Sequence, residues 1–235
     1  MCSSDLNLVT LSEELDRYGV DAIRVTMSFA GPPEDDIDWK DVSPAGAQKF
    51  LARAWRLSGE VQAPKGADAK GGDAALRRET HRFWRDAPGL IEALKFNVVV
   101  ARLMELTNAT RKAVDGSAGP ADPAVREAVE AIALGLSLYA PYTAEDMWAR
   151  LGHEPSIANA GWRKPDPTLL VEQSTTAVVQ VNGKVRDRVE VPASIGADEL
   201  EALARELPGV VRAVGDGQVV KAIVRAPQLV NLVVR

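Results

Sequence analysis

Three basic residues alternate with other residues in the stretch KVRDRVEV: Lys184, Arg186 and Arg188. In a β-strand, residues two apart lie on one face, about 6–7 Å from each other. This distance matches the spacing of phosphates along a nucleic-acid strand, so the three cations could hold a phosphate backbone. The alternative is the solvated outer face of a half-buried sheet, with Val185, Val189 and Val191 on the inner face. The residues alone leave both interpretations open.

The charge and hydropathy of the whole chain limit the possible partners. The 235 residues carry a formal net charge of −5, which argues weakly against nucleic acid. Residues 175–235 nevertheless hold a slight excess of Lys and Arg, and Lys221 and Arg225 would extend the basic face if their strand lay beside the first. Residues 77–112 form a second basic region, with eight Lys and Arg against four Asp and Glu. The longest apolar run, FNVVVA, is far too short to span a membrane, so no membrane partner is expected.

Other kinds of chemistry find little support. The sequence has no GxGxxG, GxxxxGK[ST], HExxH or GxSxG motif. One cysteine, Cys2, and two histidines, His81 and His153, are too few for a disulfide, a cysteine-based zinc site or a histidine-based triad. This cysteine usage suits the cytoplasm. We expect His81 to be structural or to face a phosphate, and the acidic loop PPEDDID to be solvated rather than to bind a metal, because it lacks calcium-loop spacing.

Helical patterns occupy residues 10–151. Thr10 with Glu13, and Thr143 with Asp146, have the spacing of capping boxes, and Ser43-Pro44 is a strong helix start. Apolar residues recur every three or four positions over 96–106 and 125–139. We expect an antiparallel bundle with the five tryptophans as core anchors, built from helices near 11–18, 21–31, 43–59 and 74–87, one from about 90, and others near 125–139 and 143–150.

The pattern changes after residue 151. Residues 152–174 contain three prolines and are expected to form a linker. Asn182-Gly183, between two alternating stretches, predicts a hairpin with a type I′ turn. A helix over 197–207 and further strands in VVRAV and KAIVR…LVNLVVR would complete a β-β-α-β-β domain over 175–235. The expected fold class is therefore mainly α, an antiparallel helical bundle followed by a small α+β domain.

Several stretches resemble one enzyme family. NLVTLSEELDRYGVDAIRVTMSFAGPPEDDIDW resembles the segment that follows the signature loop of bacterial leucyl-tRNA synthetases. FNVVVARLMELTN and LYAPYTAEDMW resemble the anticodon-binding helical bundle of the class I leucyl, isoleucyl and valyl synthetases. The terminal VVQVNGKVRDRVEVP…VVKAIVRAPQLVNLVV is similar to the C-terminal domain of the leucyl enzymes in particular. The resemblance covers residues 7–235.

The resemblance implies a part of the enzyme without its catalytic machinery. In the family, the nucleotide-binding and editing domains precede the signature loop, so residues 1–9 would be a remnant of that loop and Met1 an internal cut. Ser3 stands where the family has a lysine that stabilises the charge on the ATP phosphates, and a serine has no charge with which to do so. ATP with magnesium would serve the parent leucine–tRNA ligase. This chain would need no cofactor or metal and would be inactive by itself.

The implied role is to position leucine-accepting tRNA beside the catalytic domain of the same enzyme, as a cytoplasmic monomer. Phosphate contacts would come from Lys184, Arg186, Arg188, Lys221 and Arg225, and secondarily from Arg77, Arg78, Arg82 and Arg85. The linker would let the small domain swing, and the lost catalytic neighbour would leave an exposed apolar patch within residues 1–60. Two alternatives remain, a helical protein-interaction module without RNA affinity of its own and the equivalent part of a valyl or isoleucyl synthetase.

Overall fold

The computed structural model describes residues 9–171, 174–193, 195–215 and 217–235. It divides the chain into two compact units, residues 1–170 and 171–235. The expected remnant over residues 1–9, with Ser3, lies outside the described residues except for Val9. Within the described part of the chain, every helix is too short or too polar to cross a membrane.

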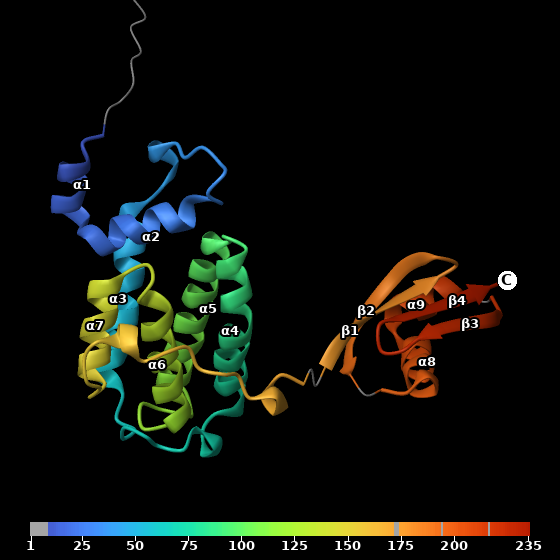
Figure 1. Cartoon of the computed structure of the whole chain (residues 1–235). Coiled ribbons are helices and arrows are strands. Elements are labelled where there is room, and N and C mark those ends of the chain that lie inside the picture. Colours follow the sequence, from blue (N-terminus) through green and yellow to red (C-terminus); the bar gives the residue numbers. More distant parts are fainter. Residues whose placement is uncertain (1–8, 172–173, 194, 216) are drawn as a thin grey trace, which may run out of the picture. The chain divides into compact units, whose positions relative to one another are not determined.

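The first unit is a helical bundle, as predicted (Figure 1). Its helices α3 to α7 run side by side, and α1 and α2 lie across one end of them (Figure 1). Helix α6 is the central one, because it contacts α3, α4, α5 and α7 and is buried over most of its length. The helices are α1 (Leu11–Tyr18), α2 (Val20–Ala30), α3 (Pro44–Glu60), α4 (Ala74–Glu92), α5 (Phe96–Asp115), α6 (Pro123–Leu136) and α7 (Pro141–Arg150).

A glycine permits close packing at the centre of this bundle. A Cβ atom on Gly135 in α6 would lie 2.6 Å from side-chain atoms of both Phe83 in α4 and Leu103 in α5. Such a distance is shorter than van der Waals contact, so only glycine lets the three helices approach this closely. Of the five tryptophans, Trp84 and Trp148 are buried as predicted, whereas Trp55 and Trp162 are partly exposed.

Helix α2 is attached to the bundle through the ends of two other helices. The guanidinium group of Arg24 donates to the carbonyl oxygens of Leu138 and Tyr139, which follow α6, at 3.0 Å each. Asp21 accepts from the backbone N–H and the hydroxyl of Thr143, both at 2.7 Å, in the first turn of α7. A cation near a helix C-terminus and an anion at an N-terminus are the favourable arrangement, because each complements the helix dipole.

The predicted helix boundaries near residues 87, 90 and 143 are wrong, since α5 starts only at Phe96, whereas α1 spans the predicted residues but lacks the predicted side-chain cap. α4 continues through Pro88 to Glu92, where a break near residue 87 was expected. The loss of one backbone donor is tolerated there because the helix remains packed on the core through Ala87 and Leu90. α7 begins at Pro141 and not at Thr143, whose hydroxyl bonds Asp21 instead of capping its own helix. Thr10 makes no side-chain capping bond, although its carbonyl accepts from Glu13 N at 3.1 Å.

Much of the predicted linker belongs to the first unit. The N–H of Asp166 donates to Nδ1 of His81 at 2.8 Å, and the indole N–H of Trp162 donates to the carbonyl of Trp84 at 3.0 Å. Arg163 forms an ion pair of 2.6 Å with Glu130. We call residues 152–170 the strap, because they lie along the bundle while remaining irregular apart from short 3₁₀ turns.

The second unit is a four-stranded sheet with two helices (Figure 1). The strand order is β2-β1-β4-β3, with antiparallel pairs β1–β2 and β3–β4 and a parallel pair β1–β4. Asn182 and Gly183 have φ values of 50° and 77°, which are those of the predicted type I′ turn. The elements are β1 (Ser174–Val181), β2 (Lys184–Pro192), α8 (Ala197–Glu206), α9 (Pro208–Val214), β3 (Val219–Arg225) and β4 (Leu229–Val234).

One predicted strand of this unit is a helix. VVRAV lies in α9, which starts with Pro208 in its first turn and ends at Gly215, with φ 52°. A proline favours a helix start and a glycine with positive φ favours a helix end, so the two flanking residues outweigh the strand propensity of the valines. The two remaining strands come from KAIVR and LVNLVV, so the order is β-β-α-α-β-β and the α+β class is confirmed.

Candidate nucleic-acid interface

The sheet of the second unit has one covered face and one open face. α8 and α9 pack against the face that carries the buried residues Val179, Val181, Val230 and Leu232. Residues directly opposite each other on paired strands share a face, so the register assigns Val178, Gln180, Leu229 and Asn231 to the other face. Neither of the helices described in this unit packs on that second surface, which we call the open face.

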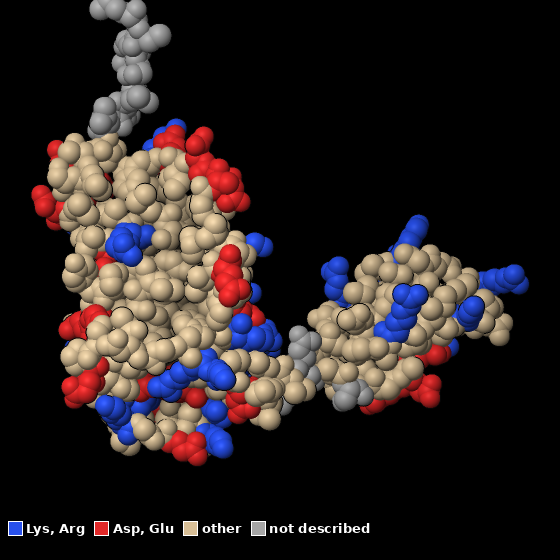
Figure 2. All heavy atoms as spheres, viewed as in Figure 1, with Lys and Arg blue, Asp and Glu red and all other residues tan. Residues whose placement is uncertain are grey.

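Basic residues from both outer strands reach the open face. Arg188 in β2 is paired with Val178, Val178 with Leu229, and Leu229 with Arg225 in β3, so these four residues form one row across the sheet. Lys221 is paired with Val233 and lies on the same face as Arg225. All three cations are exposed. On the side of the second unit seen in Figure 2, Lys and Arg predominate, and Asp and Glu gather along the edge where α8 lies.

A β-bulge changes the predicted faces of the hairpin. The register of β1 and β2 shifts between Val179 and Gln180, so Val179 is opposite Asp187 but Gln180 is opposite Val185. Val185 therefore shares the open face and is 49% exposed, and the prediction that it points the same way as Val189 and Val191 is wrong. Lys184 is opposite the buried Val181 and is therefore out of line with Arg188, and Arg186 lies at the bulge, where the register pairs it with no residue of β1. All three basic side chains are exposed.

β3 does not lie beside the hairpin, which was the condition for Lys221 and Arg225 to extend its basic row. Two strands, β1 and β4, separate β2 from β3. At about 4.8 Å per strand, the Cα atoms of Arg188 and Arg225 are about 14 Å apart. The result is a face with Arg188 on one margin, Lys221 and Arg225 on the other, and uncharged residues between them. Glu190, opposite Thr176, lies on the same margin as Arg188.

The four arginines of α4 differ in their availability. Arg77 is 8% exposed and its Nε donates to Glu127 at 3.1 Å, so its charge is used inside the bundle. Arg82 and Arg85 are exposed and form ion pairs with Glu79 at 2.8 Å and with Asp86 at 2.6 Å. Arg78 is half-buried. The helix thus presents Arg78, Arg82 and Arg85 at the surface, but mostly beside acidic neighbours, which reduces the local positive potential.

His81 is buried within the bundle and holds the strap. Its Nε2 lies 3.3 Å from Oε1 of Glu127, and its Nδ1 accepts from the N–H of Asp166. The ring also packs edge-on against Trp84, with 4.7 Å between centroids. The structural alternative predicted for this histidine therefore agrees with its position. Asp166 itself accepts a hydrogen bond of 2.7 Å from the hydroxyl of Thr168, which holds the pKa of the Asp166 carboxyl below its ordinary value.

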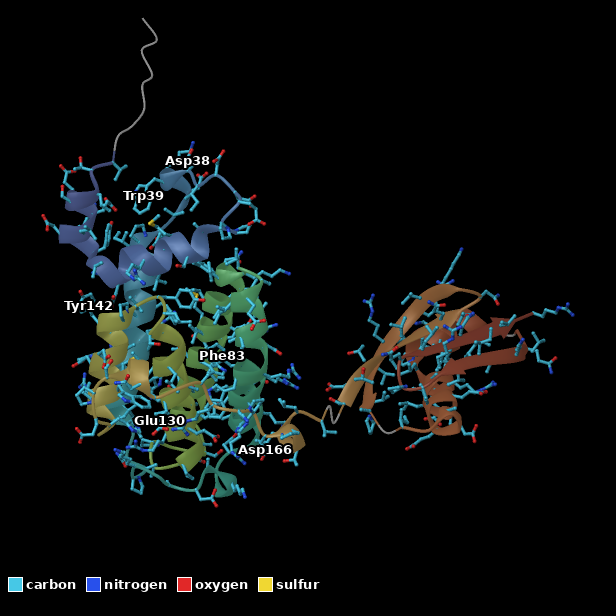
Figure 3. All side chains as sticks on the ribbon, viewed as in Figure 1. Asp38, Trp39, Phe83, Glu130, Tyr142 and Asp166 are labelled. Carbon is cyan, nitrogen blue, oxygen red and sulfur yellow. The ribbon has the colours of Figure 1, made fainter. Side chains whose placement is uncertain are left out.

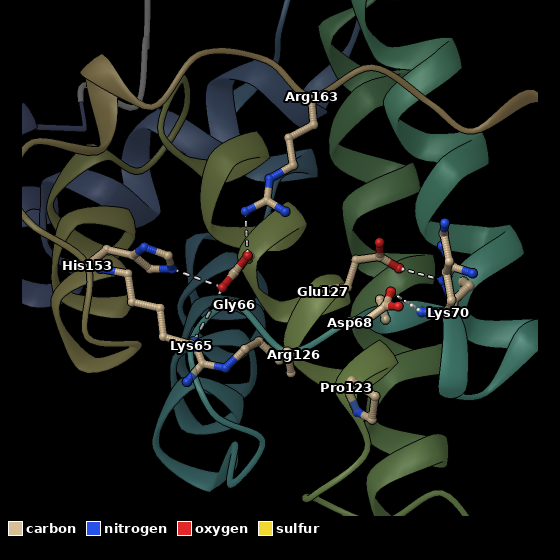
Figure 4. Close-up of a pocket in the computed structure, with 13 residues that line it drawn as sticks. Lys65, Gly66, Asp68, Lys70, Pro123, Arg126, Glu127, His153 and Arg163 are labelled. Carbon is tan, nitrogen blue, oxygen red and sulfur yellow. Dashed lines mark hydrogen bonds and ion pairs between the residues drawn. The ribbon is translucent and has the colours of Figure 1, made fainter.

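Two acidic residues of α6 organise the polar centre of the first unit (Figure 4). Glu130 is 4% exposed and receives Arg126 at 3.3 Å, His153 at 2.9 Å and Arg163 at 2.6 Å. It and Glu127 line a cavity of about 310 Å³ (Figure 4). Every partner named here is a basic or imidazole group, so the buried carboxylates have hydrogen-bond donors. Because two of these partners belong to the strap, the cluster fixes the strap to α6. Figure 3 shows Glu130 and Asp166 in their places on the first unit.

The sequence analysis missed Glu127 and Glu130. They stand three positions apart in PAVREAVEAIALGL, a segment that is otherwise largely apolar and that becomes a buried helix. Acidic residues on the buried stripe of a helix need partners, so this spacing is a signal that could have located the cluster. His153 was noted only for its rarity, and no pattern in the sequence connects it to Glu130.

The acidic loop exposes carboxylates, and the N-terminal helices expose apolar side chains. Glu34, Asp35, Asp36 and Asp38 are all exposed, and Asp38 lies 2.5 Å from Lys40. The side-chain hydrogen bond with Lys40 holds the pKa of the Asp38 carboxyl below its ordinary value. Within residues 1–60 the described part of the chain has large apolar side chains that are individually exposed, and the predicted apolar patch stays a prediction: Val9, Leu11, Val20, Met27, Phe29, Ile37 and Trp55.

Comparison with protein families and relatives gives a consistent set of similarities. A family described as the anticodon-binding domain of tRNA ligase matches residues 73–201. A leucine–tRNA ligase of Leifsonia xyli subsp. xyli (strain CTCB07) is 66% identical over 235 residues, which make up 100% of this chain and 27% of that protein. A leucine–tRNA ligase of Tropheryma whipplei (strain Twist) is 43% identical, with coverage of 100% and 29%.

One solved structure has a similar fold. It is the ternary complex of Agrobacterium radiobacter K84 agnB2 LeuRS-tRNA-LeuAMS, with a TM-score of 0.78 and 22% sequence identity. The match covers 97% of this chain and 31% of that chain. The present chain thus spans less than a third of the length of each of these proteins.

Proposed function

We propose, from the premise that this chain belongs to the family of anticodon-binding domains of tRNA ligases, that it is the tRNA-holding part of a leucine–tRNA ligase. These relatives are leucine–tRNA ligases, and their high identity over this whole chain supports the leucine assignment over the valyl and isoleucyl alternatives. Because the chain spans about 27% of such a relative, we assign activation of leucine with ATP and magnesium, and its transfer to tRNA, to the remainder of the enzyme. We further propose that the enzyme is a cytoplasmic monomer.

The observation that carries the proposal is the open face of the sheet. Its margins carry Arg188, Lys221 and Arg225, and no helix described in this unit covers it. Arg186 is exposed at the bulge, where the register does not assign it to a face, so we treat it as an additional candidate contact. Cations about 14 Å apart across this face can contact two different phosphates of one RNA backbone. Lys184, at the tip of the hairpin, would add a contact beyond this face.

The composition of the second unit supports phosphate and shape recognition rather than base reading. Residues 174–235 contain no Phe, Trp, Tyr or His, so this unit has no ring on which a base could stack. Sequence-specific reading of single-stranded RNA commonly uses such stacking. We therefore assign to these cations the positioning of the tRNA, with specificity coming from the shape of the outer corner and the long variable arm.

The first unit has a smaller share in the proposed tRNA contact. Arg78, Arg82 and Arg85 remain as candidate contacts, whereas we assign Arg77 a structural role because it is buried against Glu127. We assign the apolar surface of Met27 and Phe29 on α2 to contact with the remainder of the ligase. This assignment accounts for the apolar surface without a separate protein-interaction function.

A binding measurement tests the proposal. Fluorescence anisotropy of labelled leucine-accepting tRNA is followed while the chain is added at two salt concentrations. We expect saturable binding that weakens steeply with salt, and at least about ten-fold weaker binding when Arg188 and Arg225 are both changed to Gln. A matched variant with Arg205 and Arg212, on α8 and α9, changed to Gln should bind nearly as well as the unaltered chain.

Two results would count against the proposal. Equal loss of affinity in the matched variant would mean that total charge matters and the open face does not. Salt-independent binding, or none by a chain whose circular dichroism shows it folded, would mean that this part of the enzyme does not hold tRNA by itself.

A further inference from the structure

A cavity of about 530 Å³ lies between α2, α3 and α7 in the first unit, away from the basic residues considered above. Three aromatic side chains line it: Tyr18 from the end of α1, Trp55 from α3 and Tyr142 from α7. Tyr142 is 72% exposed, and Figure 3 shows it at the side of the bundle, below the level of α1 and α2. The cavity is therefore open to ligands from solution.

The charged groups that line this cavity are both acidic. They are Asp21 and Asp146, and the lining contains no Lys, Arg or His. Asp146 accepts a hydrogen bond from the indole N–H of Trp55, and Asp21 accepts from Thr143. Among the described residues neither carboxylate forms an ion pair. Two negative charges thus face a cavity whose lining contains no positive charge, and the guanidinium of Arg150 lies nearby on the Trp55 ring.

Asp21 in particular is incompletely satisfied. The residue is 8% exposed, and its Oδ1 atom is buried with no hydrogen-bond partner, while Oδ2 takes both bonds from Thr143. A desolvated carboxylate oxygen without a donor carries a large free-energy cost. A cation in the adjoining cavity would not touch the buried Oδ1 atom, but it would be attracted by the charge of the Asp21 carboxylate, which is among the groups that line the cavity.

The aromatic rings favour the same kind of ligand. Guanidinium groups already lie over two of them, Arg150 at 3.8 Å from the Trp55 centroid and Arg17 at 5.0 Å from the Tyr18 centroid. Among the described residues no Lys or Arg lies over Tyr142, so this exposed ring has its face available. Aromatic rings combined with carboxylates are the arrangement that recognises organic cations in water.

We propose that this cavity binds an organic cation, an ammonium or guanidinium group, between the ring of Tyr142 and the carboxylates of Asp21 and Asp146. The group could belong to a lysine or arginine side chain of another protein segment or to a free polyamine, which share this chemistry. The site does not depend on the tRNA contact proposed for the sheet, because it lies in the other unit.

Two N–H groups report directly on the site. The indole N–H of Trp55 donates to Asp146 and the backbone N–H of Thr143 donates to Asp21, so a cation at these carboxylates must change both chemical shifts. The experiment is an NMR titration of the ¹⁵N-labelled chain with N-acetyl-lysine amide, and with N-acetyl-norleucine amide as the uncharged probe. We expect saturable shifts of both resonances with the lysine probe at a Kd of about 1–10 mM, and none with the norleucine probe.

Variants separate a cation site from an apolar groove. Tyr142→Phe keeps the ring face and should bind as the unaltered chain does, whereas Tyr142→Leu keeps an apolar side chain without a π system and should bind about five-fold more weakly. Asp146→Asn should weaken binding at least as much, because it removes an exposed charge at the cavity. Asp36→Asn removes the same charge from the exposed loop and should leave the affinity unchanged.

The outcomes decide whether the cavity binds a cation and which kind of cation it prefers. Equal shifts with the norleucine probe, equal affinity of Tyr142→Phe and Tyr142→Leu, or no saturable shift at all would overturn the proposal. A blocked tri-lysine peptide and spermidine carry the same three positive charges and distinguish the two sources. Tighter binding of the peptide supports a protein side chain as the occupant, and tighter binding of spermidine supports a polyamine.

Discussion

Arg188 and Arg225 lie at opposite ends of one row of paired residues that crosses the open face of the sheet. The residues between them, Val178 and Leu229, are uncharged and only partly buried. The two arginines come from positions 37 residues apart, and the parallel pairing of β1 with β4 brings them into the same row. A basic surface of this kind depends on the strand order, and a count of charges along the sequence would not locate it.

The first prediction concerns these two arginines and tRNA. Changing either Arg188 or Arg225 to Ala should remove about one phosphate contact and so reduce the slope of log affinity against log salt by about 1. In the double variant the slope should fall by about 2, because the two residues are too far apart to contact the same phosphate. Anisotropy titrations over a series of salt concentrations measure the slope. Arg205→Ala serves as the control, since Arg205 is paired with Glu201 on α8, and an equal change there would contradict the assignment.

The second prediction concerns the buried carboxylate of Glu130. Glu130→Gln removes the charge that compensates Arg126, His153 and Arg163, and should lower the free energy of unfolding of the first unit by about 3–5 kcal/mol. Glu105→Gln is the matched control, because its pair with Arg102 is exposed and should cost less than about 1 kcal/mol. Urea denaturation followed by tryptophan fluorescence measures both. Similar losses in the two variants would show that burial of the cluster has no energetic effect.

The third prediction uses two glycines in helices. Gly135→Ala places a methyl group 2.6 Å from Phe83 and Leu103 and should destabilise the bundle by about 1–3 kcal/mol through overpacking. Gly89→Ala in α4 meets no atom within 4 Å and should stabilise the bundle by up to about 1 kcal/mol, because alanine is the better helix former. Thermal unfolding of the two variants should shift the midpoint in opposite directions. A shift in the same direction would contradict the close approach of α6 to α4 and α5.

The fourth prediction concerns Tyr139 at alkaline pH. Burial raises the pKa of Tyr139 from its ordinary value of 10.0 to about 12, so the folded state keeps the proton when the unfolded state has lost it. The unfolded state then binds fewer protons, and this group's contribution to stability is present below pH 10 and lost between about pH 10 and 12, by up to about 1.4 kcal/mol per pH unit.

Tyr139→Phe isolates that contribution. Its hydroxyl is buried without a hydrogen-bond partner, so the variant should be about as stable as the unaltered chain at pH 8. Above pH 10 the variant should lose stability less steeply, because the other tyrosines and lysines titrate equally in both proteins. Urea denaturation at pH 8, 10 and 11 provides the comparison. Parallel declines would mean that Tyr139 ionises as readily in the folded state as in the unfolded one.

Local patterns in the sequence predicted much of the fold, because turns and helix caps are determined by residues that are adjacent in the sequence. Asn182-Gly183 specifies its turn by backbone conformation, and Ser43 accepts from Gly46 N at 3.2 Å as a helix cap. One error arose where a distant contact decides, and another where a local signal was given too little weight. Thr143 bonds Asp21, which is 122 positions away, and VVRAV became a helix because of Pro208 and Gly215 on its flanks.

The basic surface was only partly predictable for the same reason. The three cations of the hairpin, Lys184, Arg186 and Arg188, are exposed as expected. The bulge after Val179, however, places Lys184 on a different face from Arg188. No pattern in the local sequence predicts that bulge. The row from Arg188 to Arg225 depends on a parallel pairing between the first and last strands of the unit, which the sequence pattern does not specify. The clusters of Glu127 and Glu130 likewise depend on partners in two other segments, α4 and the strap.

The central place of β4 has a consequence for synthesis on the ribosome. β4 is the last strand in the order of the chain, yet it pairs with both β1 and β3. The sheet therefore cannot close until Val234 has left the exit tunnel, and until then β1 offers an unpaired edge on one side. The bundle needs no residue beyond the strap, so we expect it to fold while translation continues. The nascent chain would thus acquire its two units at separate times, the sheet after the bundle.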